Sequence, residues 1–221
     1  MHRRTLMTAL PVAALSAALP VFRPARAQAE ATALREFRVL RAGRDIGRHR
    51  LSARQDADGF ALDIDIELVV RVLGIAAYRY EMSVAERWSG GQLVRLDSKT
   101  NDDGTDDFVR IQREGEGLAV DGSGFSGTQP GEAVATTYHS VDLMQRRPWL
   151  SSQSGKPIAI DPRPVAGEAG AFAMGGELGN VLIYDSAGDW SGCRFDAGGE
   201  PAEYALSEAS GSIAGLWQAG S

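Results

Sequence analysis

The chain has 221 residues, with 23 basic and 29 acidic side chains and a net charge of −6. Residues 1–27 contain four arginines and no acid, so the remaining 194 residues carry a net charge of −10. An acidic surface of this kind repels phosphate backbones, which argues against a nucleic-acid partner. A chain of 194 residues suits one domain with a sizeable core.

Residues 1–27 have the pattern of a cleaved export signal. A basic start and an apolar run over residues 5–22 precede Ala25-Arg26-Ala27, a small-x-small cleavage site that predicts a cut before Gln28. The Arg-Arg-Thr-Leu-Met sequence at residues 3–7 favours the twin-arginine route, although the pair also fits an ordinary secretory signal. The run is too short, and too interrupted by proline, to span a membrane. We therefore expect a soluble periplasmic protein with no membrane span after cleavage.

The clearest pattern in the rest of the chain is an alternation of apolar and polar residues from 60 to 84. Every even position from Phe60 to Val70 is apolar, and acids occupy three of the positions between them. A period of two predicts a strand with one dry and one wet face. A second long strand is predicted at 78–88, and further strands are predicted at 37–40, 46–51, 93–100, 108–113, 118–120, 157–160, 181–184, 190–195 and 203–206.

Turn residues separate these runs and indicate an antiparallel order. A glycine-rich loop is expected at 122–131, and Ser140 and Pro148 bound one short helix near residues 140–147. About ten antiparallel strands with one helix predict an all-β fold, either a curved sheet forming a partly closed barrel or a sandwich. We expect one β domain over residues 28–206 and a loose tail over residues 207–221.

Seven different short motifs follow one another along the chain. In order, they are Ile46-Gly47-x-His49, Glu86-x-Trp88, Thr100-x-Asp102-Asp103-Gly104, Ser154-Gly155-Lys156, Leu182-x-Tyr184, Gly188-Asp189-Trp190 and Glu203-Tyr204-x-Leu206. This order and spacing resembles a family of exported bacterial proteins, the domain of unknown function (DUF) 6134 family, over about residues 36–206. The resemblance implies an all-β periplasmic domain and supplies no catalytic residue. At Tyr138-His139 the chain departs from the family pattern, which has an aromatic followed by Asn.

Few residues have the chemistry of a metal or catalytic site. His49 and His139 could pair at a metal with Asp102, but no His-x-x-x-His or Cys-x-x-Cys spacing supports this, and His49 is expected at the surface or in a hydrogen bond. The acids of residues 102–107 lack the order of a calcium loop and are expected in a solvated turn. The single cysteine, Cys193, is expected to be buried. We expect no catalytic residue, no metal and no cofactor.

A long dry face with few helices to cover it favours a cavity for an apolar or amphipathic small molecule. The candidate ligand-binding residues are Leu62, Ile64, Tyr80, Trp88 and Trp190. Three alternatives remain open. These side chains could be ordinary core, the same face could bind another envelope protein, or the chain could be a hydrolase with an unrecognised site. A polar cleft joining His139, Asp142 and Arg146 or Arg147 would favour the hydrolase.

Overall fold

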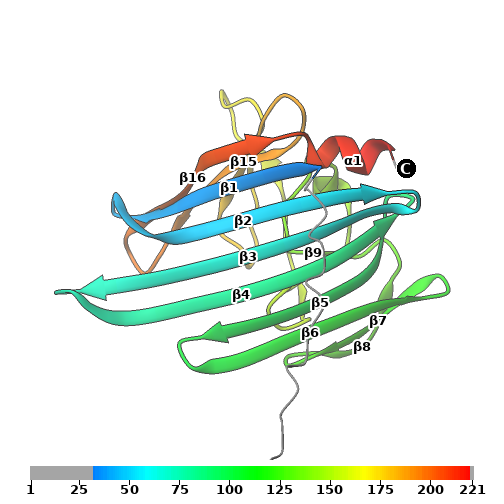
Figure 1. Ribbon diagram of the computed structural model, residues 1–221, viewed down its shortest axis with the longest axis horizontal. Coiled ribbons are helices and arrows are strands. Elements are labelled where there is room, and N and C mark those ends of the chain that lie inside the picture. The colour runs from blue at the N-terminus through cyan, green and yellow to red at the C-terminus, as the bar shows by residue number, and fades with distance from the viewer. Residues whose placement is uncertain (1–31, 220–221) are drawn as a thin grey trace, which may run out of the picture.

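The computed structural model describes residues 32–219, and the predicted export signal lies outside these residues. Within them the chain forms a curved sheet of thirteen strands, a small sheet of three strands, a 3-10 helix over Val141–Gln145 and the α-helix α1 (Ile213–Ala219) (Figure 1). The strands are β1 (Ala33–Arg41), β2 (Arg44–Asp56), β3 (Gly59–Val72), β4 (Ile75–Ser89), β5 (Gln92–Asp102), β6 (Thr105–Glu114), β7 (Gly117–Gly122), β8 (Ser126–Pro130), β9 (Val134–Ala135), β10 (Trp149–Leu150), β11 (Pro157–Ile158), β12 (Arg163–Pro164), β13 (Ala171–Ala173), β14 (Val181–Tyr184), β15 (Trp190–Asp196) and β16 (Pro201–Ser210).

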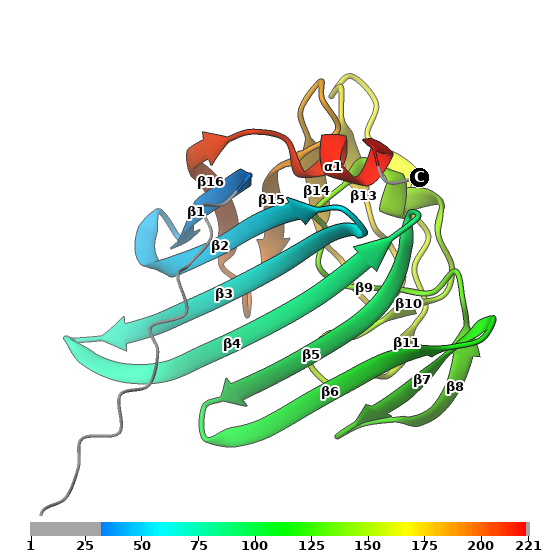
Figure 2. The ribbon, with the colours of Figure 1, turned by 45° about the vertical axis from the view of Figure 1, so that its right-hand side comes forward.

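The large sheet is built from antiparallel hairpins. Its order is β12-β13-β14-β15-β16-β1-β2-β3-β4-β5-β6-β7-β8, so β1 to β8 follow one another and the chain then returns to pair β16 with β1. The connection between β8 and β12 lies against one face of the sheet and carries β9, β10 and β11 (Figure 2). The sheet therefore has an inner face, covered by this connection, and an outer face.

The all-β prediction is confirmed, but the strand number is larger than the ten expected. The expected glycine-rich loop at 122–131 contains β8, and β9 to β13 are two or three residues long. β11 falls within the strand predicted at 157–160. The other four are too short to show a period of two, so a pattern search does not find them.

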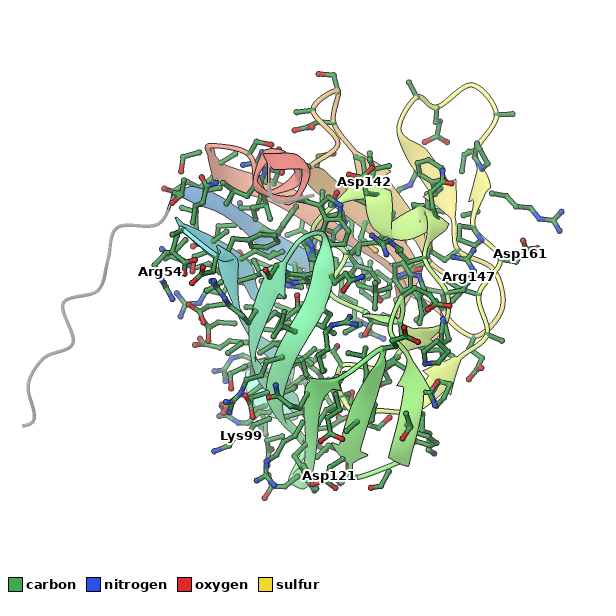
Figure 3. All side chains as sticks on the ribbon, turned by 90° about the vertical axis from the view of Figure 1, so that its right-hand side faces the viewer. Arg54, Lys99, Asp121, Asp142, Arg147 and Asp161 are labelled. Carbon is green, nitrogen blue, oxygen red and sulfur yellow. The ribbon has the colours of Figure 1, made fainter. Side chains whose placement is uncertain are left out.

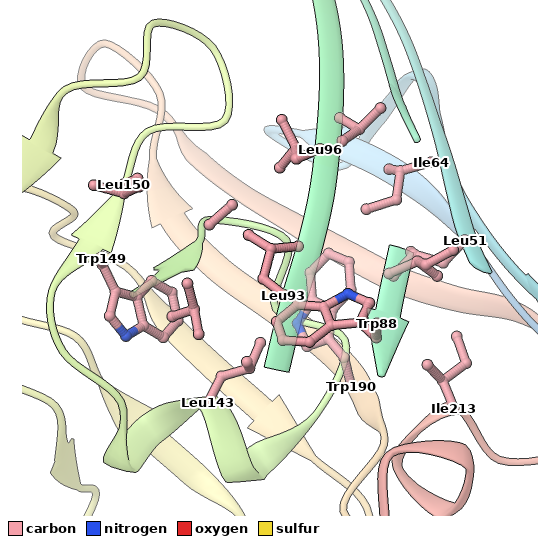
Figure 4. Packing of buried hydrophobic residues seen from close by; sticks show 14 of the residues in the cluster. Leu51, Ile64, Trp88, Leu93, Leu96, Leu143, Trp149, Leu150, Trp190 and Ile213 are labelled. Atoms are coloured by element: carbon pink, nitrogen blue, oxygen red, sulfur yellow. The ribbon is translucent and has the colours of Figure 1, made fainter. Parts of the chain in front are cut away.

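The alternation over residues 60–84 is the reason that the inner face is dry. Ile64 lies opposite Val84 and Ile66 lies opposite Met82, and all four side chains are buried. Residues of the connection complete the core, and Figure 4 shows Leu143 and Trp149 on its side and Leu93 and Trp88 on the side of the sheet. The inner layer is therefore close-packed over most of its area.

The outer face is charged, and many of its ions are paired with each other. Arg48 bonds Glu67, Arg54 bonds Asp63, and Arg87 makes two bonds to Asp56. Figure 3 shows Arg54, Lys99 and Asp121 directed away from the inner space. Among residues 32–219, no helix is both long enough and apolar enough to cross a bilayer.

The expected helix near 140–147 is present as the 3-10 helix Val141–Gln145, and the Ser140 hydroxyl accepts a hydrogen bond from the Asp142 N–H as its cap. The expected loose tail from Ser207 differs in the structure. β16 continues to Ser210, and α1 follows with Ile213 and Trp217 buried.

The tail is ordered because it contacts a carboxylate that is distant in the sequence, a contact that the local sequence pattern does not predict. Asp189 Oδ1 accepts the N–H groups of Ile213 and Ala214, and its Oδ2 lies 2.7 Å from Nη2 of the buried Arg35. An acid that accepts the first N–H groups of a helix fixes the start of that helix.

Candidate functional site

A cavity of about 350 Å³ lies between the inner face of the sheet and the connection that covers it. Its floor is apolar and comes from β3 and β4, through Ile64, Ile66, Leu68, Met82 and Val84. The period of two along both strands directs these side chains to one side of the sheet. The cavity is thus a direct consequence of the alternation over residues 60–84.

The other walls of the cavity are uncharged and partly polar. They comprise Tyr78 and Tyr80 of β4, Phe195 and Tyr204 near the β15–β16 hairpin, His49 of β2 and residues 136–138, 151–153, 158 and 178 of the connection and its continuation. None of the eighteen lining residues is Lys, Arg, Asp or Glu. In this respect the cavity contrasts with a hollow of about 920 Å³ on the outer face, which is lined by ion-paired Arg and Asp residues.

His49 is the one buried polar group of the lining whose side chain lacks any partner among the described residues. It is 4% exposed, and neither ring nitrogen makes a hydrogen bond. Aromatic rings enclose it, with Trp190 at 5.0 Å and Tyr204 at 5.4 Å between centroids, both edge-on. Burial lowers the pKa of the imidazole to about 3, so the ring is neutral and offers one donor and one acceptor.

This position of His49 contradicts the expectation of a surface or hydrogen-bonded side chain. The polar residues beside it in the sequence face outward, whereas His49 itself lies opposite Ile66 on the inner face. A buried donor and acceptor without partners is uncommon and costs free energy. An unpartnered group that borders a cavity is therefore a candidate ligand contact.

The tyrosines supply hydroxyl groups along the cavity wall. Tyr80 donates to Sδ of Met82 at 3.3 Å and to Oε1 of Gln153 at 3.3 Å, and burial raises the pKa of this phenol to about 12. Burial also raises the pKa of Tyr138 and Tyr204 well above the usual value. All three phenols therefore stay neutral at physiological pH and act as hydrogen-bonding groups without charge.

Tyr138 is held in an unusual conformation. Its φ is +58°, in the left-handed region that non-glycine residues seldom adopt. In this conformation its ring lies 5.7 Å from Trp190 and 5.9 Å from Trp149. The surrounding rings thus fix a strained tyrosine in the cavity wall, a feature that recurs at binding sites.

One rim of the cavity is held by hydrogen bonds to the β5–β6 turn. The Tyr78 hydroxyl donates to Asp102 at 2.7 Å, and the Gln153 amide donates to Asp102 at 3.4 Å and to Asp107 at 3.1 Å. The acids expected in a solvated turn therefore also tie the connection to the sheet. No group of three His, Cys, Asp or Glu residues within residues 32–219 is arranged to hold a metal.

A second buried polar cluster lies deeper in the core. Oε2 of Glu86 accepts the indole N–H of Trp88 at 2.6 Å and lies 3.9 Å from Nδ1 of His139. Burial raises the pKa of Glu86 to about 7, against the opposing effect of the Trp88 hydrogen bond, and burial lowers the pKa of His139 to about 3. His139 is therefore neutral, and its ring packs against Trp88 and Trp217 at 5.2 and 5.6 Å.

The side chains that would mark a hydrolase cleft make separate contacts. His139 faces Glu86, whereas Asp142 lies beside its cap Ser140 and Arg146 donates to the Gly91 carbonyl. His139 is 1% exposed. These contacts hold the 3-10 helix and the core together and do not form the polar cleft that the hydrolase alternative needs.

The five residues predicted to bind a ligand separate into two groups. Ile64 and Tyr80 line the cavity. Leu62, Trp88 and Trp190 do not line it and lie in the packed core, at 0%, 1% and 1% exposure. Cys193 is buried as expected, and burial raises the pKa of its thiol to about 12.

A family model described as Domain of unknown function (DUF6134) matches residues 37–207 of the chain. A solved structure, the beta-barrel-like protein of domain of unknown function DUF1849 from Brucella abortus, is similar with a TM-score of 0.54 and 11% identity. The match covers 81% of this chain and 97% of that one, and at this identity it supports the fold alone. No curated protein matches the sequence.

Proposed function

The chain belongs to the DUF6134 family, a domain of unknown function, and we propose that it binds a small uncharged molecule, apolar or amphipathic, in the cavity on the inner face of its sheet. The observation that carries the proposal is the absence of Lys, Arg, Asp and Glu from the eighteen lining residues. A charged ligand there would lose its hydration without gaining an ion pair. A volume of about 350 Å³ falls within the range of small-molecule sites.

The position of the polar groups supports an amphipathic ligand. Ile64, Ile66 and Met82 form an apolar floor, whereas His49 and Tyr80 offer hydrogen bonds from the walls. A ligand with an apolar body and one uncharged polar group, such as a hydroxyl, carbonyl or amine that is neutral at pH 7, would satisfy both. The His49 ring borders this space, and its nitrogens have no partner among residues 32–219.

The proposed place of action is the periplasm. This part of the proposal rests on residues 1–27, whose basic start, apolar run and Ala-Arg-Ala end predict export and cleavage before Gln28. Export would expose the protein to the small apolar and amphipathic molecules of the cell envelope. The experiment below therefore uses protein recovered after export.

Native mass spectrometry of protein purified from the periplasm tests both parts of the proposal. The expected spectrum shows a chain that begins at Gln28 and a second species heavier by one small molecule, which disappears when the protein is denatured. A Leu68→Trp variant, which fills the cavity near its edge, should fold and lose the heavier species. An adduct that remains in this variant would place the ligand elsewhere, and a chain that retains residues 1–27 would contradict cleavage.

A further inference from the structure

Exposed apolar side chains gather at the turn between β3 and β4. Val72, Leu73 and Ile75 are 58%, 97% and 74% exposed, and we call these three residues the β3–β4 tip. Two other large apolar side chains among the described residues are exposed, Phe108 at 37% and Leu206 at 41%, and they lie on different strands. Figure 1 shows the tip extending beyond the neighbouring β1–β2 and β5–β6 turns. The tip is therefore the most accessible apolar surface of the described chain.

The leucine of the tip is not required by the turn. Leu73 and Gly74 have φ of +51° and +84°, a two-residue hairpin geometry that favours Asn or Asp before Gly. The same geometry occurs at Asp103-Gly104, with φ of +49° and +93°, and at Ala42-Gly43, with φ of +47° and +72°. The chain thus builds the same turn with Asp or Ala elsewhere, and at this one it exposes a leucine almost fully to solvent.

The arginines beside the tip differ from most other arginines of β2 and β4, although Arg44 of β2 also has no ion pair with a described residue. Arg48, Arg54 and Arg87 of β2 and β4 each pair with a carboxylate. Arg71 and Arg79 are exposed, and neither is in an ion pair with a described residue. Residues 68–80 contain these two cations and no acid. The tip therefore combines apolar side chains with unneutralised positive charge.

The nearest acids are held back from the tip. Asp102 and Asp103 lie at the β5–β6 turn. Asp102 accepts a hydrogen bond from the Tyr78 hydroxyl, and Asp103 accepts one from the Arg79 N–H at 3.3 Å. Figure 1 shows that this turn ends short of the tip. A surface that contacts the tip would meet the leucine first and Arg71 next, ahead of these carboxylates, and Arg79 lies level with Asp103.

We propose that the β3–β4 tip docks on a bilayer that contains anionic lipid, with its apolar side chains at the acyl boundary and Arg71 and Arg79 against the headgroups. Apolar side chains flanked by cations are the composition of interfacial membrane contacts. The inner face continues from the tip into the cavity. Next to the tip, Val70 pairs with Tyr78 and Leu68 pairs with Tyr80, and Leu68, Tyr78 and Tyr80 line the cavity. The docking does not depend on whether the cavity holds a ligand.

Vesicle flotation tests the proposal. The chain from Gln28 is used, because residues 1–27 contain an apolar run of their own that could bind lipid. It should float with vesicles of phosphatidylcholine and phosphatidylglycerol at low salt and lose binding as salt rises. Arg71→Gln and Arg79→Gln should each weaken binding about fivefold, and Leu73→Asp should weaken it at least about tenfold.

Ala42→Asp is the matched control, because it makes the same change of charge in a turn of the same geometry, beyond which the tip extends (Figure 1). It should bind as the unchanged chain does. Equal binding of Leu73→Asp and Ala42→Asp would overturn the proposal, as would failure of the unchanged chain to float. Sedimentation equilibrium without lipid should give a monomer, and an oligomer that Leu73→Asp dissociates would assign the tip to self-association and also overturn it.

A dye at the tip measures insertion directly. Cys193 is buried, so Leu73→Cys introduces the single accessible thiol of the described chain. Labelled with a dye that brightens in apolar surroundings, this variant should brighten on addition of phosphatidylglycerol vesicles, and Ala42→Cys with the same dye should not. Equal responses at the two turns would contradict insertion of the tip.

Discussion

Glu86 is a carboxyl group that the fold holds in its neutral form at moderately low pH. Burial raises its pKa from 4.5 to about 7. Its contribution to stability is therefore fully present below pH 4.5 and is lost as the pH rises through about 7. His49 and His139 act in the opposite direction, because their lowered pKa values cost stability as the pH falls below 6.5. The stability of the protein thus contains opposing proton-linked contributions in the core.

A Glu86→Gln variant isolates the glutamate from the histidines. The amide oxygen can still accept the Trp88 indole N–H. Relative to the unchanged chain, the free energy of unfolding of this variant should rise by about 3 kcal/mol between pH 4.5 and pH 8. Urea unfolding at the two pH values measures it. Glu81→Gln, an exposed change on the same strand, serves as control, and a pH-independent difference for Glu86→Gln would contradict the raised pKa.

At the scale of elements, the predictability of the fold follows the length of the pattern. β3 and β4 could be predicted because more and less buried side chains alternate over residues 59–67 of β3 and over the fifteen residues of β4. The helix α1 could not, because its seven residues are too few for a helical period and its order depends on Asp189, which lies far away in the sequence. A local pattern contains no information on such a contact.

The same limit applies to the candidate site. Alternation identifies which side chains face inward, and two of the side chains it predicts to do so, Ile64 and Tyr80, line the cavity. It does not distinguish an inward side chain that meets empty space from one that meets the connection, and Leu62, Trp88 and Trp190 are of the second kind, buried in the core and absent from the cavity lining. His49 had a usable signal, because Leu51, two residues further along, is apolar and faces the same side.

Asp189 holds α1 against the rest of the fold, so its substitution should lower the stability of the protein. Asp189→Asn removes the charge that Arg35 needs, and loss of one member of a buried pair costs about 3–5 kcal/mol. We expect lower stability and faster hydrogen exchange of the amides of Ile213 and Ala214. Asp185→Asn is the control, since Asp185 lies 3.9 Å from Arg35 and is 39% exposed, and it should cost less than about 1 kcal/mol. Equal costs for the two variants would contradict the role of Asp189.

On the scale of the whole molecule, the two faces of the curved sheet differ in charge and in covering. Its outer face is charged and largely self-neutralised, and its inner face is covered by the connection except where the uncharged cavity remains. The helix α1 lies near the end of the sheet opposite the β3–β4 tip (Figures 1 and 2). The long strands therefore join an apolar projection at one end to a closed, packed region at the other, with the cavity along the inner face between them.

The central claim is that the cavity accepts uncharged ligands and rejects charged ones. The most direct measurement is a fluorescence titration with two dyes that share a ring system, the uncharged N-phenyl-1-naphthylamine and the anionic 1-anilinonaphthalene-8-sulfonate. We expect the uncharged dye to bind at least about tenfold more tightly than the anionic one. Leu68→Trp should abolish binding of the uncharged dye, and His49→Phe should weaken it. Leu206→Trp is the control and should bind this dye as the unchanged chain does. Equal affinity for the two dyes, or full binding to Leu68→Trp, would contradict the account.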